Sequence, residues 1–206
     1  NISFDFPSSL LLIANNDFTN CRNILMKKYS ESFFSIYDAI TNHLIISMPS
    51  AFICSSFSKL LANIKRITLS NSVKSIQCNA FNNCISLAQI LIPSSVTKIG
   101  NHAFRKCSLL KQISIPSSIT SIEDYSFSEC SSLSQIIIPS SVNAIGNYAF
   151  NECKKLVQLS IPALITSIGN GAFKRCLSLK QISTLSFITI IGDYTFSECS
   201  SLSEMS

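Results

Sequence analysis

The stretch LSQIIIPSSVNAIGNYAFNEC, residues Leu133–Cys153, decides the fold, because close copies of it return every 23 residues. Its most regular feature is a phenylalanine followed three positions later by a cysteine, in six consecutive units. The pairs are Phe81 and Cys84, Phe104 and Cys107, Phe127 and Cys130, Phe150 and Cys153, Phe173 and Cys176, and Phe196 and Cys199. A constant internal period of about 20 to 50 residues marks a chain built by stacking one small unit. The sequence therefore predicts a repeat solenoid.

Each part of the unit predicts a local structure. Ile136 and Ile138 occupy alternate positions and Pro139 follows them, which is typical of a short strand with one buried face that ends at a corner. The A-F-x-x-C stretch spaces its apolar residues by three, so we expect one helical turn there. Gly146 precedes that turn, as a tight bend favours, but Glu123 takes the equivalent place in another coil. A left-handed backbone is therefore not required at that bend in every coil.

A single unit cannot fold alone, because many of its apolar side chains would face water at its two open ends. Neighbouring units must cover these side chains. Stacked units place equivalent strands side by side at roughly 4.8 Å. We therefore expect a parallel β-sheet on one face, with short strands, turns and helical turns on the other.

The pattern weakens toward the N-terminus. Phe6 to Cys21 reproduces the apolar, proline, phenylalanine and cysteine positions of Ile92 to Cys107, so we expect a regular coil over residues 1–24. Residues 81–206 form regular repeats, whereas residues 25–80 match poorly. Since 206 residues correspond to about nine units, we interpret the whole chain as one array. Neither end carries the polar cap that a solenoid needs, so we expect it to continue into further repeats at one or both ends.

Two structures are possible for residues 25–80. Pro7 to Pro49 spans 42 residues and Pro49 to Pro93 spans 44, each short of two full units, which indicates two shortened coils. The alternative is a helical insertion. Apolar residues from Ile53 to Ile64 fall at helical spacing, and Ser30 or Ser32 could cap a helix over residues 33–43.

The repeated unit resembles the BspA-like leucine-rich repeat family, closely over residues 81–206 and 4–24 and more weakly from 25 to 80. The resemblance implies a right-handed solenoid with a parallel sheet along one face. It also implies a non-enzymatic module that binds a protein or another cell-surface or extracellular-matrix macromolecule, as adhesins and antigens of bacteria and protists do. A cytoplasmic location is the alternative. Two positions depart from the family pattern, Glu123 at the glycine position and Leu185 at the proline position.

Composition restricts the function classes. The chain is 47% hydrophobic and 13% charged, so it can bury a long core and is not disordered. Its net charge of +5 is spread over scattered basic residues that do not alternate with aromatic ones, which argues against nucleic-acid binding. Charged residues recur beside the F-x-x-C cysteines with opposite signs on adjacent coils. We expect them to form a solvated face with ion pairs between coils, which stabilise little when exposed.

The cysteines and histidines indicate no chemistry. Seven of nine cysteines share one repeat position, which favours an inward-facing small side chain with a weak S–H donor over disulfides. The nearest candidate metal pairs, Cys78 with Cys84 and His102 with Cys107, lack zinc-site spacing. His43 and His102 are the two histidines, and neither has a recurring carboxylate partner. We therefore predict no catalytic residue, metal or cofactor. No apolar run long enough to span a membrane and no signal peptide is visible.

The remaining candidate site is the outer surface of the predicted sheet. The residues on either side of the first buried apolar residue of each strand should point outward. They are Gln89, Leu91, Gln112, Ser114, Gln135, Ile137, Gln158, Ser160, Gln181 and Ser183. Five glutamines in line could form a hydrogen-bonded amide ladder, a purely structural role, or a flat polar strip that binds an extended partner. The functional hypotheses are accordingly a recognition module, a structural spacer without a dedicated ligand, and an intracellular scaffold.

Overall fold

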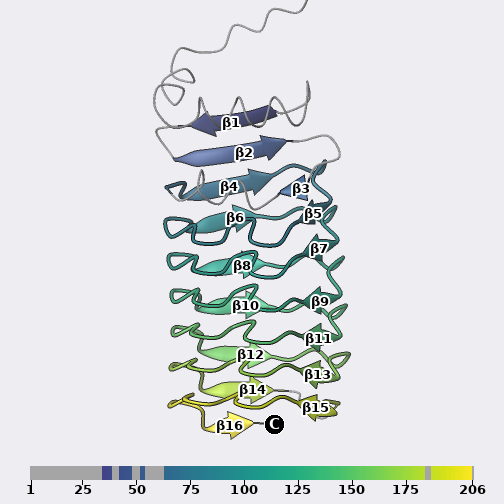
Figure 1. The fold of residues 1–206 in the computed structure, drawn as a ribbon, viewed down its shortest axis with the longest axis vertical. Helices are drawn as coiled ribbons and strands as arrows, with labels where there is room; N and C mark the ends of the chain where they lie inside the picture. The colour runs from purple at the N-terminus through teal and green to yellow at the C-terminus, as the bar shows by residue number, and fades with distance from the viewer. Residues whose placement is uncertain (1–33, 39–41, 48–51, 54–62, 184–186, 206) are drawn as a thin grey trace, which may run out of the picture.

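The computed structural model describes residues 34–38, 42–47, 52–53, 63–183 and 187–205. These residues form a stack of coils in which each coil supplies strands to two series (Figure 1). The first series, which we call the main face, contains β2 (His43–Ser47), β4 (Arg66–Leu69), β6 (Gln89–Leu91), β8 (Gln112–Ser114), β10 (Gln135–Ile137), β12 (Gln158–Ser160), β14 (Gln181–Ser183) and β16 (Glu204–Met205). The second series, the side face, contains β3 (Phe52–Ile53), β5 (Ser75–Ile76), β7 (Lys98–Ile99), β9 (Ser121–Ile122), β11 (Ala144–Ile145), β13 (Ser167–Ile168) and β15 (Ile190–Ile191).

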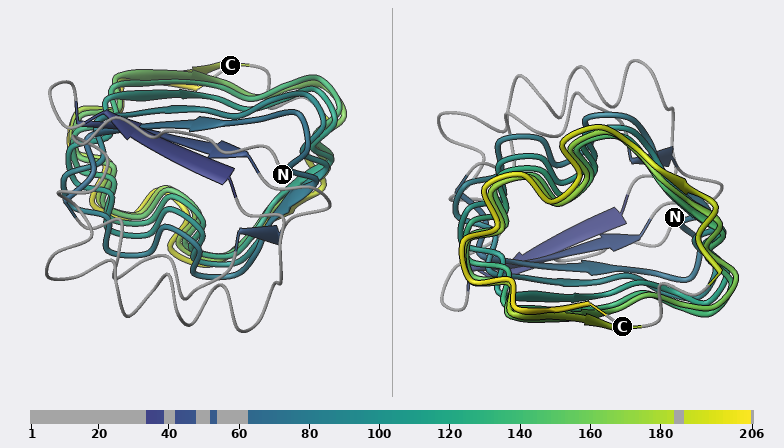
Figure 2. Two further views of the ribbon diagram at one scale, coloured as in Figure 1. Left: turned by 90° about the horizontal axis from the view of Figure 1, so that it is seen from above. Right: turned by 90° about the horizontal axis from the view of Figure 1, so that it is seen from below.

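Hydrogen-bonded neighbours within each series run parallel with a register of one repeat. They form three sheets on the main face, which contain β2, β4 and β6, then β8 and β10, then β12, β14 and β16, and two on the side face, β3 to β7 and β9 to β15. Ile136 lies opposite Ile113 on the main face, and Ile145 lies opposite Ile122 on the side face. Seen along the stack, the coils superimpose, with the main face on one side and an undulating path on the opposite side (Figure 2). We call this undulating part, from the end of each side-face strand to the next repeat cysteine, the turn side. The expected parallel solenoid is confirmed.

The expected helical turn on the turn side is wrong, because no described residue lies in a helix. The Cys107 N–H does bond to the Phe104 carbonyl three residues earlier at 3.1 Å, as the spacing of three suggested. However, Lys106 has a left-handed backbone, with φ of 63°, which interrupts any helix. The Phe104 and Lys106 N–H groups instead donate to the backbone carbonyls of Ser126 and Ser128 in the next coil, both at 2.8 Å. The segment is thus a chain of tight turns whose alternate N–H groups join neighbouring coils.

Left-handed residues recur at the same two places in successive coils. They are Asn79 and Asn83, His102 and Lys106, Tyr125 and Glu129, Tyr148 and Glu152, Gly171 and Arg175, and Tyr194 and Glu198. All but one of these residues carry a Cβ, so the left-handed conformation is strained. In every one of these coils but the last, the N–H groups of both residues donate to carbonyls of the next coil, which offsets this strain. The repeat therefore depends on its neighbours for its local backbone as well as for its core.

The core is a column of phenylalanine rings. Phe104, Phe127 and Phe150 are completely buried, and adjacent rings stack with centroids 5.4–5.5 Å apart and planes within 5° of parallel. The column continues to Phe81 at one end and through Phe173 to Phe196 at the other, with centroids 5.1–5.7 Å apart. Because each ring touches the ring of the next coil, the column joins the coils into one continuous core.

Within the described residues, the repeat cysteines lie beside this column as reduced thiols, and for them the packing interpretation is confirmed. Cys107 and Cys153 are completely buried, and their thiols donate to the carbonyls of Phe81 and Phe127 at 3.2 and 3.3 Å. Burial raises the pKa of the Cys84 thiol to about 12. Burial also raises the pKa values of Cys107 and Cys153 well above the usual 9.0. These thiols are protonated donors within the stack rather than nucleophiles.

Position 146 requires a glycine because the preceding coil lies close to it, and not because of its backbone angle. A Cβ there would lie 2.7 Å from the Asp124 nitrogen and 2.8 Å from the Glu123 carbonyl carbon of the preceding coil. Its φ lies outside the left-handed region, whereas Gly171 has a φ of 59°. The expectation that this bend does not require a positive φ is confirmed, and close approach between coils explains the glycine.

The register corrects the interpretation of the N-terminal part. Leu44 and Ile46 of β2 lie opposite Ile67 and Leu69 of β4, one full repeat apart, and β3 lies one full repeat before β5. The coil from β2 to β4 is therefore not shortened. Counted from this register, the position of Pro93 falls at Ser47 and not at Pro49, so the interval from Pro49 to Pro93 does not measure two coils.

Strand β1 (Phe34–Asp38) also differs from both alternatives for its region. It pairs antiparallel with β2, so Phe34–Asp38 is neither part of a helix over residues 33–43 nor a parallel strand of the stack. Residues 1–33, including the coil expected over 1–24, lie outside the described part, as do 54–62 and Leu185. The division of the chain into nine coils stays a prediction.

Candidate binding face

The predicted binding residues lie together on the outer surface of the main face. Strands β6, β8, β10 and β12 each have an exposed, buried, exposed pattern, so both flanking residues of every strand reach solvent. In β14, Gln181 is exposed and Ser183 is partly exposed. The register places Gln112 beside Gln135 and Gln158 beside Gln181, which makes the glutamines one column along the stack.

Strand geometry decides which side chains point outward. In β10, Ile136 is 8% exposed and Ile137 is 77% exposed, although the two residues are identical. Successive side chains of a strand point to opposite sides of its sheet. The alternation therefore places Ile137 on the surface and leaves its apolar side chain uncovered.

The glutamine column is not a hydrogen-bonded ladder. Among the residues whose side chains are described, no hydrogen bond joins the amides of Gln89, Gln112, Gln135, Gln158 and Gln181. Backbone bonds and the buried apolar rows hold these strands together. The amides are therefore available to a partner, each with two donor hydrogens and one acceptor oxygen.

The main face, together with the edge at which its strands begin, also carries apolar and basic side chains. Leu91 is 57% exposed and stands in the same column as Ile137, while Val157 is 40% exposed. Lys65, Lys111 and Lys180 are exposed and share one repeat position, directly before the glutamine position. This mixture of amides, aliphatic side chains and ammonium groups forms a flat surface for contact.

Sequence reasoning missed the basic residues of this face and the two ends of the glutamine column. Arg66 lies opposite Gln89, and Glu204 lies opposite Gln181, so a cation and an anion continue the column. Counting in steps of 23 from Gln89 would have found both residues, and the same step links Lys65, Lys111 and Lys180. The basic residues looked scattered because their common repeat position is occupied by lysine in only some coils.

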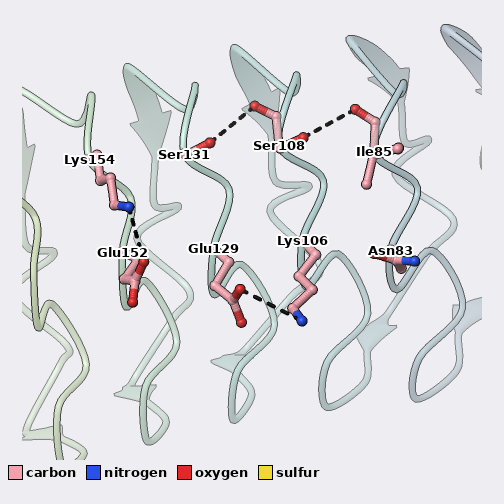
Figure 3. Close-up of a pocket in the computed structure, with 8 residues that line it drawn as sticks. All are labelled: Asn83, Ile85, Lys106, Ser108, Glu129, Ser131, Glu152 and Lys154. Carbon is pink, nitrogen blue, oxygen red and sulfur yellow. Dashed lines mark hydrogen bonds and ion pairs between the residues drawn. The ribbon is translucent and has the colours of Figure 1, made fainter.

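A second surface, a shallow groove of about 340 Å³, lies where the turn side meets the residues that follow the repeat cysteines (Figure 3). Its charged side chains already neutralise one another. Lys106 lies 3.8 Å from Glu129, and Lys154 lies 3.2 Å from Glu152. The Ser108 and Ser131 hydroxyls donate to carbonyls of the preceding coils. We therefore regard the groove as a solvated corner.

Ion pairs between adjacent coils occur on the turn side, as expected. Arg105 lies 2.9 Å from Glu129, and Arg175 lies between Glu152 at 3.3 Å and Glu198 at 2.8 Å. Burial acts to raise the pKa of Glu152, but its hydrogen bonds and charge interactions with Lys154 and Arg175 outweigh that effect and lower the pKa. Glu152 is thus held in its charged form.

The histidines have structural neighbours. The His43 Nε2 lies 2.8 Å from the Thr68 hydroxyl, and the His102 ring stacks on Tyr125 with centroids 4.7 Å apart. Burial and the charge of Arg105 lower the pKa of His102, and Asp124 acts in the opposite direction. In the described part of the chain, no three His, Cys, Asp or Glu side chains are arranged to hold a metal ion.

Parallel strands in register, a stacked apolar column and one exposed sheet surface define a solenoid of the leucine-rich-repeat class. The family described as BspA type Leucine rich repeat region, in six copies, matches residues 50–144 and 130–206. The chain belongs to this family. The resemblance drawn from the repeated unit is therefore confirmed.

Solved structures of bacterial leucine-rich repeat proteins are similar to this chain. The T. pallidum leucine-rich repeat protein TpLRR has 28% sequence identity and a TM-score of 0.67, over 85% of this chain and 79% of that protein. A leucine-rich repeat protein from Bacteroides ovatus has 26% identity and a TM-score of 0.61, over 85% of this chain and 52% of that one. No curated protein matches the sequence. Within the described residues, no helix has the length and apolarity needed to cross a membrane.

Proposed function

We propose that this chain is a non-enzymatic protein-interaction module that binds its partner through the main face. The observation that carries the proposal is the exposed row of glutamines, which stands in register along the stack and makes no hydrogen bonds within itself. Leucine-rich repeat proteins of this family are generally interaction modules, and solenoids commonly bind through an extended sheet surface. By family resemblance, the partner belongs to a cell surface or extracellular matrix, and the chain acts as part of an adhesin or antigen.

A structural spacer is the second candidate, and the contacts between coils favour it. The Asn147 N–H donates to Asp124 Oδ1 at 2.6 Å, and the Asn170 N–H donates to Asn147 Oδ1 at 2.8 Å. These bonds repeat from coil to coil and stiffen the turn side. A spacer needs such stiffness, but it does not need an exposed strip of unpaired amides.

The test compares two triple variants with equal changes in net charge. The first, Gln112→Glu, Gln135→Glu and Gln158→Glu, changes three exposed positions of the main face. The second, Thr97→Glu, Thr120→Glu and Asn143→Glu, changes three exposed positions that directly precede side-face strands. Both variants should keep the circular dichroism spectrum of the unchanged chain, since all six positions are solvent-exposed.

Binding is measured with peptides selected from a displayed library of random twelve-residue peptides on the unchanged chain. We expect the main-face variant to lose most of the selected peptides and the side-face variant to keep them. If the two variants bind the selected peptides equally well, the main face is not the binding surface. That result would favour the structural spacer.

A further inference from the structure

We infer that the main face binds an extended protein segment that is rich in acidic and aliphatic residues. This inference rests on the proposed function and specifies the chemistry of the partner. It follows from how charge is divided between the main face and the turn side.

The acidic side chains gather away from the main face. Residues 63–183 and 187–205 contain seven acidic residues, and all except Glu204 lie on the turn side. The six on the turn side are Glu123, Asp124, Glu129, Glu152, Asp193 and Glu198. Their carboxylates include the acceptors of every ion pair found in these ranges. The basic residues of the turn side are thereby neutralised.

The basic residues of the main face have no such neutralisation. Lys65, Arg66, Lys111 and Lys180 are exposed, and none of them forms an ion pair with another residue of the described part. Within residues 63–183 and 187–205, Glu204, at the C-terminal end of the glutamine column, is the single acidic residue on that surface. The face therefore has an excess of positive charge. Such a field attracts acidic partners and repels basic ones.

The spacing of the lysines suits an extended chain that runs along the stack. Lys65 and Lys111 are two coils apart, which at roughly 4.8 Å per coil is about 10 Å. Lys111 and Lys180 are three coils apart, or about 14 Å. An extended peptide advances about 3.3 Å per residue, so these intervals correspond to about three and about four residues. Because only every second side chain of an extended segment faces the same surface, acidic residues at even intervals of two or four positions, about 7 or 13 Å, would face the stack together, and the flexible lysine side chains can span the remaining difference.

The aliphatic side chains between the lysines favour a peptide over an anionic polysaccharide. Leu91 is 57% exposed, Ile137 is 77% exposed, and Val157 is 40% exposed. Burying these side chains needs apolar groups on the partner, which a protein segment supplies. The glutamine amides between them can bond to a peptide backbone.

The experiment uses the whole chain and the same displayed library of random twelve-residue peptides. The variant Lys111→Gln with Lys180→Gln removes two charges from the main face. Its matched control, Lys74→Gln with Lys98→Gln, removes two charges from exposed positions at the side face. We expect the selected peptides to be acidic on average and to bind the main-face variant about tenfold more weakly. The control should remain within about twofold of the unchanged chain, and raising the salt concentration should weaken binding.

Two results would overturn the inference while leaving the proposed function intact. One is a set of selected peptides that depends on the glutamine column but is neutral or basic. The other is a sulfated oligosaccharide that binds with dependence on Lys111 and Lys180 when no acidic peptide is selected. If no selected peptide depends on the glutamine column, the proposed function itself fails.

Discussion

The Cys130 thiol donates a hydrogen bond to the carbonyl oxygen of Phe104, which lies in the preceding coil, at 3.1 Å. The same carbonyl accepts the Cys107 N–H within its own coil at 3.1 Å. One carbonyl thus serves both the local turn and the stack. Similar thiol bonds from Cys107, Cys153, Cys176 and Cys199 explain why a cysteine recurs where any small apolar residue could fill the space.

Replacing this thiol should weaken the stack. Cys130→Ala removes a weak donor and leaves a small void, so we expect the free energy of unfolding to fall by about 1–2 kcal/mol. Denaturant unfolding followed by circular dichroism measures the change. Cys78→Ala is the control, because Cys78 is exposed and its loss should cost less than about 0.5 kcal/mol. Equal effects of the two substitutions would contradict the role of the thiol bond.

The buried thiols also predict instability in alkali. Burial raises the pKa of Cys84 to about 12 and the pKa values of Cys107 and Cys153 well above 9.0. Between pH 9 and 12 the unfolded chain therefore releases protons that the folded chain keeps, and the free energy of unfolding falls as pH rises. Well below pH 8 these thiols are protonated in both states and contribute no pH dependence.

The melting temperature measured between pH 8 and pH 11 tests this dependence. Tyrosines and lysines also titrate in this range, so a chain with Cys107→Ala and Cys153→Ala serves as the control. Its melting temperature should fall less steeply with pH than that of the unchanged chain. Parallel curves would show that the thiols do not cause the dependence.

Loss of one ring should interrupt the phenylalanine column. Phe127 stacks on Phe104 at 5.5 Å and on Phe150 at 5.4 Å, so Phe127→Ala should lower the free energy of unfolding by about 3–5 kcal/mol. Phe196→Ala is the control, because Phe196 is only partly buried and is found stacked only with Phe173. Its loss should cost clearly less. Urea unfolding compares the two variants, and an equal cost would contradict a continuous column.

The repeated glycine can be tested in the same way. The Cβ of Gly146→Ala would meet backbone atoms of Glu123 and Asp124 at under 3 Å, so the coils must separate slightly. We expect a loss of about 1–3 kcal/mol in the free energy of unfolding. Glu123→Ala, at the equivalent position of the preceding coil, keeps a Cβ that the structure already accommodates, and should cost less than about 1 kcal/mol. A neutral Gly146→Ala substitution would contradict close approach as the reason for the glycine.

The repeated unit predicted most of the architecture because its period is a direct property of the sequence. Ile136, Phe150 and Cys153 each return at the same offset, so strand register and core columns followed from counting. The turn side was predicted less well. A spacing of three, as from Phe104 to Cys107, suits a helical turn and a tight turn equally, and only the left-handed backbone at Lys106 distinguishes them.

The candidate face was predicted in its glutamines but not in its charges. Glutamine recurs at one repeat position in five successive coils, from Gln89 to Gln181, so this column was found directly. Lys65 and Lys111 share a repeat position that alanine, serine or valine fills in other coils, so no periodic signal marked it. The separation of charge between the main face and the turn side could not be predicted from the sequence. It depends on where the folded coils place the carboxylates.

The most direct test of the main face as the binding surface is site-specific photo-crosslinking to peptides selected on the unchanged chain. A photo-reactive amino acid replaces Gln135 on the main face in one chain and Asn143 beside the side face in another. We predict that the bound peptide crosslinks to position 135 and not to position 143. Crosslinking at position 143 alone, or equally at both positions, would contradict binding through the main face.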